Sequence, residues 1–416
     1  MLSTEVKVFR SHPHNMRVLL LSNFIYSFVF PILDLFVSEY VMRNSNEPRL
    51  VMAYNMAMFT GIPFAFLING YALRVIPTKV LFSAGMILTA IMMAALMSCS
   101  VLNIFSICAI GFMMGLAVGT YWSNRDFLAL SSTEDSNRNY YYSLESFFGT
   151  TSGLVVPISA GWFIYWVVTY RWFGGTRDFA YDALTGLVFV LSCVAAIMVW
   201  QGNFTNPKPT RFVYWRFDPL WYQALGMSLF RGLAHGFTTV APIILVARLM
   251  HGEEAILGTL QTIGMIGAAI GMYVIARIAR PEHRLRILSA GLILYMAATI
   301  THAILFDVVG VIIFFFLQLL CRPLIETVVC QTLFRAIDVL EKKENRNSFA
   351  YIFNNEFGLF SGRLFGGLLF IVVDTYNETL ALRYVLLVIS SLQIALYFFC
   401  KHILTQCAEM EEKKAE

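Results

Sequence analysis

Apolar residues gather into long runs along the whole chain, and short polar segments separate these runs. A helix needs about 20 predominantly apolar residues to cross the hydrocarbon core of a bilayer, and twelve runs reach this length. The pattern therefore predicts an all-α integral membrane protein with twelve transmembrane helices. The predicted helices cover residues 17–41, 50–74, 78–100, 103–130, 140–168, 182–201, 219–248, 254–278, 285–305, 308–334, 347–373 and 380–402.

The composition supports this class. Hydrophobic residues make up 58% of the 416-residue chain and charged residues only 13%, whereas a soluble globular protein has about 25% charged residues. The polar stretch before the first apolar run is not followed by a small-residue cleavage site. We therefore expect no cleavable signal peptide.

The seven cysteines stand mostly inside apolar runs, without the spacing of a metal site. Cysteines in such surroundings behave as small buried hydrophobes, so we expect no metal site, no disulfide framework and no cofactor. The net charge of +4 comes from short loops between apolar runs. We therefore expect no nucleic-acid partner.

Lysine and arginine are distributed unevenly among the loops. If both termini lie in the cytoplasm, 21 of the 30 basic residues fall on the cytoplasmic side and six on the outer side. Cytoplasmic loops of membrane proteins carry an excess of basic residues, and an odd number of helices would destroy this bias. We predict a multi-pass protein of the cell membrane, or inner membrane, with both termini in the cytoplasm.

Short sequence patterns of the first half recur in the second half after 206 to 209 residues. The recurring pairs are Ser83-Ala84-Gly85 with Ser289-Ala290-Gly291, Asn137-Arg138-Asn139 with Asn345-Arg346-Asn347, and Gly149–Gly153 with Gly358–Gly362. Internal repeats of this size are typical of secondary transporters. We predict two six-helix halves, residues 1–201 and 219–416, joined by a cytoplasmic linker over residues 202–218.

Twelve spans, cytoplasmic termini and a repeat of six helices resemble the layout of the major facilitator superfamily of transporters. The family has a loop signature after its second helix; here Gly70 is followed by Arg74, Pro77 and Lys79, while the acid and the second glycine are absent. The resemblance implies alternating access, a cavity lined by helices 1, 4, 7 and 10, and contacts between the halves through helices 2, 5, 8 and 11. We expect a monomer.

Three arginines and one histidine are predicted near the membrane midplane. Arg231 and His235 lie one turn apart in the seventh helix, Arg322 lies in the tenth, and Arg363 lies in the eleventh. A charge at this depth is costly unless it faces a protein interior or a water-filled path, and guanidinium groups bind planar oxyanions. We predict that these four residues bind an anionic substrate. Further predicted substrate contacts are Tyr26, Tyr121, Trp122, Asn124 and Gln318.

Four carboxylates are candidates for proton coupling, because desolvation favours the protonated form of a carboxyl group. They are Asp34, Glu145, Glu326 and Glu356. The spacing lets Arg322 pair with Glu326, and Arg363 with Glu356, along one face of a helix. Structural ion pairs between helices are the alternative interpretation.

Another group of residues is predicted to take part in gating. These residues are Arg74, Arg125, Asp126, Gly153 and Gly362. Arg125 and Asp126 form a predicted cytoplasmic cluster with Glu145, and the two glycines belong to stripes at four-residue spacing along which another helix can approach closely. Static packing explains these stripes equally well. Bends are predicted where prolines interrupt three cavity helices, at Pro31, Pro242 and Pro323.

The leading hypothesis is a secondary transporter that moves an anionic or zwitterionic organic solute, coupled to protons. The abundance of aromatic residues and methionine favours one alternative, an exporter or flippase of an amphipathic drug, siderophore or lipid. A membrane receptor or an intramembrane enzyme is the alternative from another class. The sequence has no Walker phosphate loop, HExxH or Gly-x-Ser-x-Gly pattern, so we predict no enzyme activity. The expected partners are the lipid bilayer, a small-molecule substrate and coupling protons.

Overall fold

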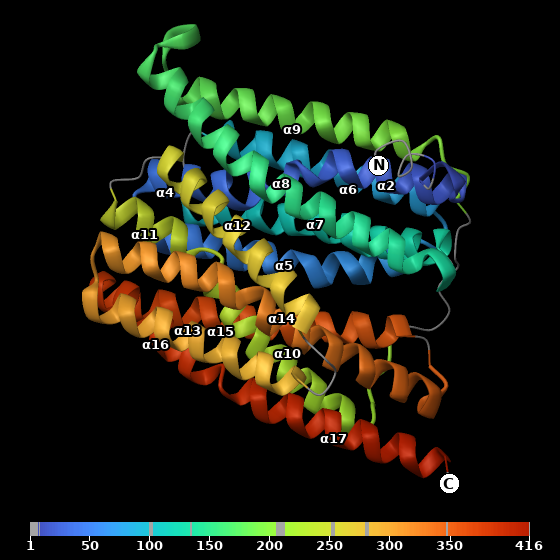
Figure 1. The fold of residues 1–416 in the computed structure, drawn as a ribbon. Coiled ribbons are helices and arrows are strands. Elements are labelled where there is room, and N and C mark those ends of the chain that lie inside the picture. The colour runs from blue at the N-terminus through green and yellow to red at the C-terminus, as the bar shows by residue number, and fades with distance from the viewer. Residues whose placement is uncertain are drawn as a thin grey trace. The chain divides into compact units, whose positions relative to one another are not determined.

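The computed structural model describes residues 7, 9–99, 103–133, 135–204, 213–250, 254–278, 283–346 and 348–415. Within these ranges the regular structure is helical and no strand occurs. Figure 1 shows the helices along the chain. Their bounds are α2 (His14–Ser27), α3 (Val29–Pro31), η1 (Ile32–Val37), α4 (Ser38–Ser45), α5 (Pro48–Ala72), α6 (Thr78–Met97), α7 (Ile104–Ser132), α8 (Asp135–Thr169), η2 (Trp172–Gly174), α9 (Arg177–Val199), α10 (Pro219–Thr238), α11 (Ala241–Leu249), α12 (Glu254–Ile278), α13 (Arg284–Leu305), α14 (Val308–Glu344), α15 (Ser348–Tyr376), α16 (Glu378–Leu392) and α17 (Ala395–Ala415).

Eleven segments of the described residues are long and apolar enough to cross a membrane. At the position of the predicted eighth helix, α12 contains a shorter apolar stretch, Ala255–Ile270. The predicted fold class, an all-α integral membrane protein with a twelve-helix architecture, is confirmed. Several helices extend beyond their predicted limits, since α14 continues to Glu344 and α8 begins at Asp135.

The first span, His14–Ser45, is interrupted in its middle. There α2 ends at Ser27, and the π-helical turn η1 covers Ile32–Val37. Because Pro31 has no backbone N–H, the carbonyl of Ser27 loses its helical donor, and helices bend or loosen at such positions. The irregularity predicted at Pro31 is confirmed, and it places Asp34 within η1.

The seventh span is divided into α10 and α11 between Thr238 and Ala241. Pro242 lacks the N–H that would bind the carbonyl of Thr238 four residues earlier. That carbonyl instead accepts a hydrogen bond of 2.9 Å from Nε2 of Gln318 on α14. The break predicted near Pro242 is confirmed, whereas α14 continues through Pro323 as one helix. The carbonyl that is freed at the break thus forms a hydrogen bond that links α10 to α14.

The chain forms two compact units. Unit 1 contains Met1–Asn46, Ala57–Thr210 and Glu254–Thr262, and unit 2 contains Glu47–Met56, Arg211–Glu253 and Ile263–Glu416. The first residues of α5 thus belong to unit 2 and the first residues of α12 to unit 1. The boundary predicted at residues 202–218 stays a prediction, and residues 205–212 lie outside the described ranges.

Inside unit 1, α6 lies beside α7 and α9 (Figure 1). A small residue permits the contact with α7, because a Cβ atom on Gly85 would lie 2.7 Å from the backbone nitrogen of Tyr121. Close backbone approach at glycine is a common way to join membrane helices. The first span belongs to the same unit, and its helix α2 packs beside α8 and α9.

Inside unit 2, α10 packs along α15, and α13 packs along α14. Glycines bring the first pair into backbone contact: a Cβ atom on Gly232 would overlap the carbonyl of Leu359, and one on Gly362 would overlap the carbonyl of Leu229. No side chain fits between α10 and α15 at these positions. Backbone contact with α15 therefore fixes the rotation of α10 and decides which of its side chains reach α14.

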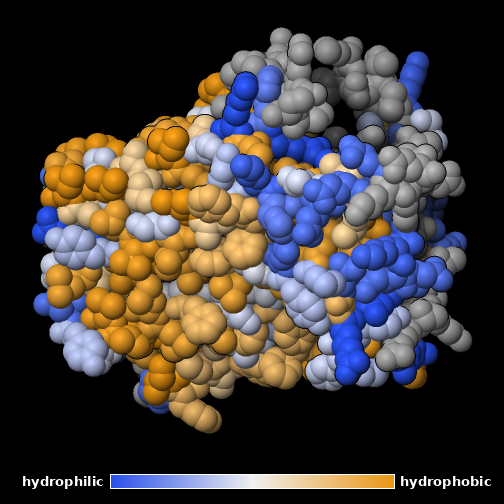
Figure 2. All heavy atoms as spheres, turned by 90° about the horizontal axis from the view of Figure 1, so that it is seen from below, coloured by the Kyte–Doolittle hydropathy of each residue, from blue (hydrophilic) through white to orange (hydrophobic). Residues whose placement is uncertain are grey.

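Apolar side chains cover an outer face of unit 2. On α16, Leu380, Tyr384, Val388 and Leu392 recur every four residues, and their exposed fractions range from 41% to 48%. Figure 2 shows hydrophobic residues over much of the visible face and hydrophilic residues gathered toward one end. An apolar stripe of this kind is stable against lipid and unfavourable in water. The stripe on α16 thus has the character expected of a surface that faces lipid in a multi-pass membrane protein.

The start of α10 depends on one carboxylate. Asp218 Oδ1 accepts a hydrogen bond of 3.0 Å from the backbone nitrogen of Leu220, and Oδ2 lies 2.5 Å from Nζ of Lys343 at the end of α14. We expect Asp218→Ala to lower the free energy of unfolding by about 1–2 kcal/mol, because it removes both the helix cap and the ion pair.

Thermal denaturation of the purified protein measures this effect. Asp218→Asn is the matched control, because asparagine caps a helix as well as aspartate but forms no ion pair. Its expected loss is at most about 1 kcal/mol, since the lysine is largely exposed. Equal losses in both variants would contradict the role of the cap.

Candidate functional site

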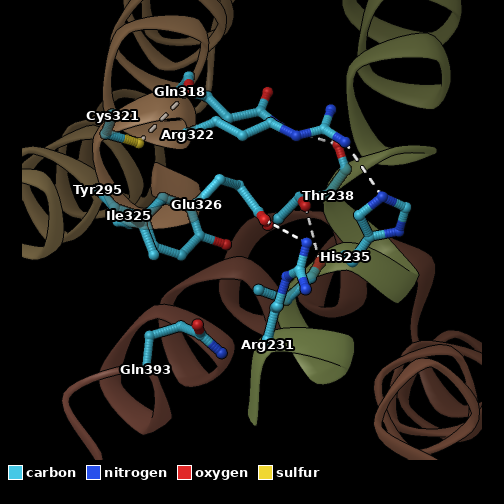
Figure 3. Close-up of a pocket in the computed structure, with 11 residues that line it drawn as sticks. Arg231, His235, Thr238, Tyr295, Gln318, Cys321, Arg322, Ile325, Glu326 and Gln393 are labelled. Atoms are coloured by element: carbon cyan, nitrogen blue, oxygen red, sulfur yellow. Dashed lines mark hydrogen bonds and ion pairs between the residues drawn. The ribbon is translucent and has the colours of Figure 1, made fainter. Parts of the chain in front are cut away.

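The candidate site is a cavity of about 50 Å³ inside unit 2 (Figure 3). Its walls come from α10, α13 and α14 and from the junction of α16 with α17. Charged side chains from α10 and α14 point toward one another across it (Figure 3). The lining residues are Arg231, Ala234, His235, Thr238, Tyr295, Gln318, Cys321, Arg322, Ile325, Glu326 and Gln393.

Helical periodicity explains why these residues meet. On α10, Arg231 and His235 are four residues apart and therefore share one face. On α14, Gln318, Arg322 and Glu326 follow the same four-residue spacing. Two polar stripes thus face each other inside an apolar bundle.

Arg231 and Glu326 form an ion pair across the two helices, with 2.5 Å between Nη2 and Oε2. Both side chains are largely buried, with exposed fractions of 21% and 29%. The pairing of Arg322 with Glu326 predicted from the sequence is wrong. The rotation of α10 brings Arg231 closer to the carboxylate than the residue one turn away on α14 itself.

Arg322 instead contacts His235, with 3.1 Å between Nη2 and Nε2. A guanidinium group has only donors, so Nε2 of the imidazole is the acceptor in this contact. The proton of the ring then sits on Nδ1, and His235 is neutral. Among the residues that the structure describes, Arg322 has no carboxylate partner.

A second ion pair lies on α15, where Arg363 Nη1 is 4.0 Å from Glu356 Oε2. The pairing predicted for these two residues along the helix is confirmed. The two side chains keep exposed fractions of 13% and 19%. Neither belongs to the residues that line the cavity, so their predicted roles in substrate binding and proton coupling stay predictions.

The comparison with known families decides the class of the protein. The sequence model described as "Major Facilitator Superfamily" matches residues 18–367, well over half of the chain. The chain belongs to the Major Facilitator Superfamily. This superfamily consists of membrane transporters, which agrees with the prediction of a transporter and not of an enzyme.

Two bacterial relatives of this Major Facilitator Superfamily protein carry no functional description. It is 23% identical over 284 residues to "Uncharacterized protein YqgE" of Bacillus subtilis (strain 168). The matched region covers 66% of this chain and 63% of that protein. It is 22% identical over 129 residues to "Uncharacterized protein in sodM 3'region" of Geobacillus stearothermophilus, which covers 31% of this chain and 60% of that protein. The matches thus span about three-fifths of the length of these relatives.

Solved transporter structures share the fold of this Major Facilitator Superfamily protein. A POT family transporter in complex with 5-aminolevulinic acid has a TM-score of 0.69 at 12% identity, and covers 94% of this chain and 97% of that one. The nucleoside transporter NupG has a TM-score of 0.64 at 12% identity, and covers 94% and 99% of the two chains. Likeness at this identity establishes the fold and leaves the substrate open.

In unit 1, the three aromatic residues that were predicted to contact substrate pack together in one cluster with Phe30. The rings of Tyr26 and Tyr121 lie 4.4 Å apart, and those of Phe30 and Trp122 lie 5.1 Å apart. Tyr26 and Tyr121 are buried, whereas Trp122 keeps 36% of its surface exposed. The two tyrosines act as core residues in this structure, and contact with the substrate stays a prediction for all three.

Asn124 was predicted to contact substrate, and its amide is engaged elsewhere in the structure. Its Nδ2 donates to Oδ1 of Asn69 at 2.7 Å, and Asn69 donates back at 3.3 Å. The residue is fully buried. Reciprocal amide bonds satisfy polar groups inside a membrane protein, so this pair joins α5 to α7.

The cluster predicted around Glu145 is confirmed for one pair, Arg125 with Glu145, whereas its cytoplasmic location stays a prediction. Nε of Arg125 donates to Oε1 of Glu145 at 2.8 Å, and Nδ2 of Asn23 donates to the same oxygen at 2.8 Å. The side chain of Asp126 lies outside the described part of the chain. The proposed roles of Arg125 in gating and Glu145 in proton coupling stay predictions.

The remaining predicted residues are not among those that line the cavity. Asp34 is exposed on η1, and Arg74 is exposed in the turn after α5, where its guanidinium lies 5.1 Å from the ring of Tyr71. Gly153 is half-buried on α8, and Gly362 contacts α10 within unit 2. Their predicted roles in coupling and gating stay predictions.

The sequence analysis missed six lining residues, namely Ala234, Thr238, Tyr295, Cys321, Ile325 and Gln393. Nε2 of Gln393 donates to the carbonyl of Phe230 on α10 at 2.5 Å, and Tyr295 and Cys321 are buried in the wall. An amide in an otherwise apolar span is costly in lipid unless it is bonded, and this signal could have identified Gln393. Within the described residues no group of three metal-ligating side chains occurs.

Proposed function

We propose that this transporter moves a small anionic or zwitterionic organic solute by alternating access, and that proton transfer at Glu326 couples to this movement. One observation carries the proposal: Arg322 faces a neutral imidazole, while Arg231 beside it is held by Glu326. The POT family structure in complex with 5-aminolevulinic acid is consistent with such a substrate.

An anionic group is favoured because the lining offers guanidinium donors. Planar oxyanions bind a guanidinium through two parallel hydrogen bonds, and the group stays charged at every physiological pH. A positive charge without a counter-ion within a membrane span is costly unless it faces a protein interior or a water-filled path. A substrate carboxylate that arrives at Arg322 relieves this cost, which gives the protein a reason to keep the residue there.

Coupling follows from the ion pair between Arg231 and Glu326. Protonation of the carboxylate removes its charge and releases Arg231, which then adds a second cation to the cavity. The other charged or titratable groups nearby are Arg322, Cys321 and Cys330 on α14, His235 on α10, Tyr295 on α13, and Arg363 with Glu356 on α15. In this scheme a proton and an anionic solute enter the site together.

The orientation completes the proposal. We place both termini in the cytoplasm of the cell membrane, because most of the lysine and arginine residues then fall on the cytoplasmic side. We further propose that the protein acts as a monomer. Accessibility of single cysteines introduced into the C-terminal residues after Glu412, measured in intact and in opened cells, tests the orientation.

Glu326→Gln is expected to abolish proton-coupled uptake, because the amide neither takes up nor releases a proton. Proteoliposomes loaded with a pH-sensitive dye report proton entry when 5-aminolevulinic acid or another organic anion is added outside. We expect solute-driven acidification with the natural protein and none with the variant, while exchange of solute across the membrane persists. Glu341→Gln, about four turns along α14, is the matched control and should behave like the natural protein.

If proteoliposomes that contain the Glu326→Gln variant acidify at the same rate as those with the natural protein, proton coupling at this residue would be contradicted. Loss of exchange together with loss of acidification would assign Glu326 to substrate binding. Accumulation of a hydrophobic dye in cells with and without the protein separates the alternative, export of an amphipathic compound. The charged lining of the cavity favours the small anion over that alternative.

A further inference from the structure

The charges around the cavity leave one positive charge without a counter-ion. Arg231 is balanced by Glu326 and Arg363 by Glu356. Arg322 faces only the imidazole of His235. Within the described part of the chain, the net charge of this group is therefore +1 when His235 is neutral.

His235 must be neutral in this arrangement. Every polar hydrogen of the guanidinium is a donor, so the nitrogen that receives Nη2 of Arg322 needs a lone pair. A protonated imidazole has none. The contact of 3.1 Å thus fixes the charge of the histidine as well as the direction of the Arg322 side chain (Figure 3).

The space beside Arg322 suits a head group. A site for one water needs roughly 10–15 Å³ on this measure, so the cavity of about 50 Å³ holds only a few non-hydrogen atoms. A carboxylate fits this space. Nη2 donates one of its hydrogens to His235. The other guanidinium hydrogens can then form two parallel hydrogen bonds to a carboxylate.

We infer that the cavity selects an organic monoanion and binds its single carboxylate on Arg322, with His235 as the neutral acceptor that positions the guanidinium. This inference rests on the proposed function and narrows its substrate class. While Glu326 is ionised and paired with Arg231, a monoanion brings the local charge to zero. A dicarboxylate or a phosphate monoester, whose charge at pH 7 is close to −2, leaves one negative charge unbalanced beside the carboxylate of Glu326, which is largely buried.

Thermal stabilisation and equilibrium binding with the purified full-length protein test the inference. The probes are butanoate, hexanoate and benzoate, each compared with its primary amide, with succinate, adipate and phthalate as the dicarboxylates, and with phenyl phosphate. We expect the monocarboxylates to stabilise the protein and the amides to have no effect. The dianions should bind about tenfold or more weakly, because their second charge stays unpaired beside the carboxylate of Glu326, which is largely buried. Oleate in the same panel distinguishes a lipid carboxylate from a soluble one.

Variants separate the roles of the two residues. Arg322→Gln should remove carboxylate binding. Arg335→Gln should keep it, because this half-buried arginine lies farther along α14, pairs with Glu411 and does not line the cavity. His235→Gln retains a neutral acceptor and should keep the preference for monoanions. His235→Lys adds a second cation and should shift the preference toward the dicarboxylates. Melting temperatures without ligand verify that each variant is folded.

Stronger binding of dicarboxylates or phenyl phosphate to the natural protein would overturn the inference, and so would equal binding of acids and amides. Transport of a dianion through an Arg322-dependent site would leave the proposed function intact and remove only the monoanion selectivity. Binding of monocarboxylates without any flux into proteoliposomes would contradict the proposed transport function and leave the monoanion selectivity intact. An unchanged preference in His235→Lys would show that the histidine does not set the charge of the site.

Discussion

Replacing Arg231 with glutamine is expected to abolish solute transport and to destabilise the protein. The change leaves the carboxylate of Glu326 without its partner at 2.5 Å. Removing one member of a largely buried ion pair leaves an uncompensated charge. Both side chains keep some exposure, so we expect a loss of about 1–3 kcal/mol in the free energy of unfolding.

A double variant separates stability from transport in this prediction. Arg231→Gln combined with Glu326→Gln removes both charges and should recover most of the lost stability, since two amides can bond to each other. Transport should not recover, because neither the cation nor the proton acceptor is present. Melting temperature and uptake into proteoliposomes are the two measurements. Full uptake by Arg231→Gln would remove this residue from the site.

Much of the fold could be predicted from the sequence because lipid imposes a simple rule. Every backbone polar group inside the bilayer must be bonded within the protein, so each apolar run of sufficient length becomes a helix. Breaks inside a span were harder to locate. Pro31 and Pro242 gave the signal, yet Pro323 lies in a helix that continues, so a proline alone does not decide whether a span breaks.

The site was predicted in part. The spacing of Arg231, His235, Arg322 and Glu326 indicated which residues share a face of each helix, and the structure brings all four to one cavity. Their partners were not predictable in the same way. Sequence spacing shows only neighbours on one helix, whereas the rotation of α10 against α14 decides that Glu326 meets Arg231. Glycine contacts with a third helix, α15, set that rotation.

The close contact of α10 with α15 leads to a second large effect. Gly362→Leu is expected to lower the free energy of unfolding by about 3 kcal/mol or more, at the upper end of overpacking. A Cβ atom at this position would overlap the carbonyl of Leu229, and it would lie 2.7 Å from the backbone nitrogen of Leu233. Backbone atoms cannot rotate aside as side chains do, so the two helices must separate.

Separation of these helices would also disturb the cavity. Arg231 and His235 lie on α10, and their distances to Glu326 and Arg322 depend on the position of that helix. We therefore expect Gly362→Leu to lose transport together with stability. Gly149→Leu is the matched control, because nothing lies within 4 Å of a Cβ atom at that glycine, although it belongs to the corresponding stripe of the first half.

Gly362→Ala distinguishes packing from gating at the same position. If the glycine only permits close packing, the melting temperature and the transport rate should fall together, in proportion to the size of the added side chain. If the stripe is a sliding surface, the smaller residue should slow transport while the melting temperature stays nearly unchanged. A Gly362→Leu protein with natural stability and natural uptake would contradict both interpretations, since it would mean that α10 and α15 do not meet at backbone distance.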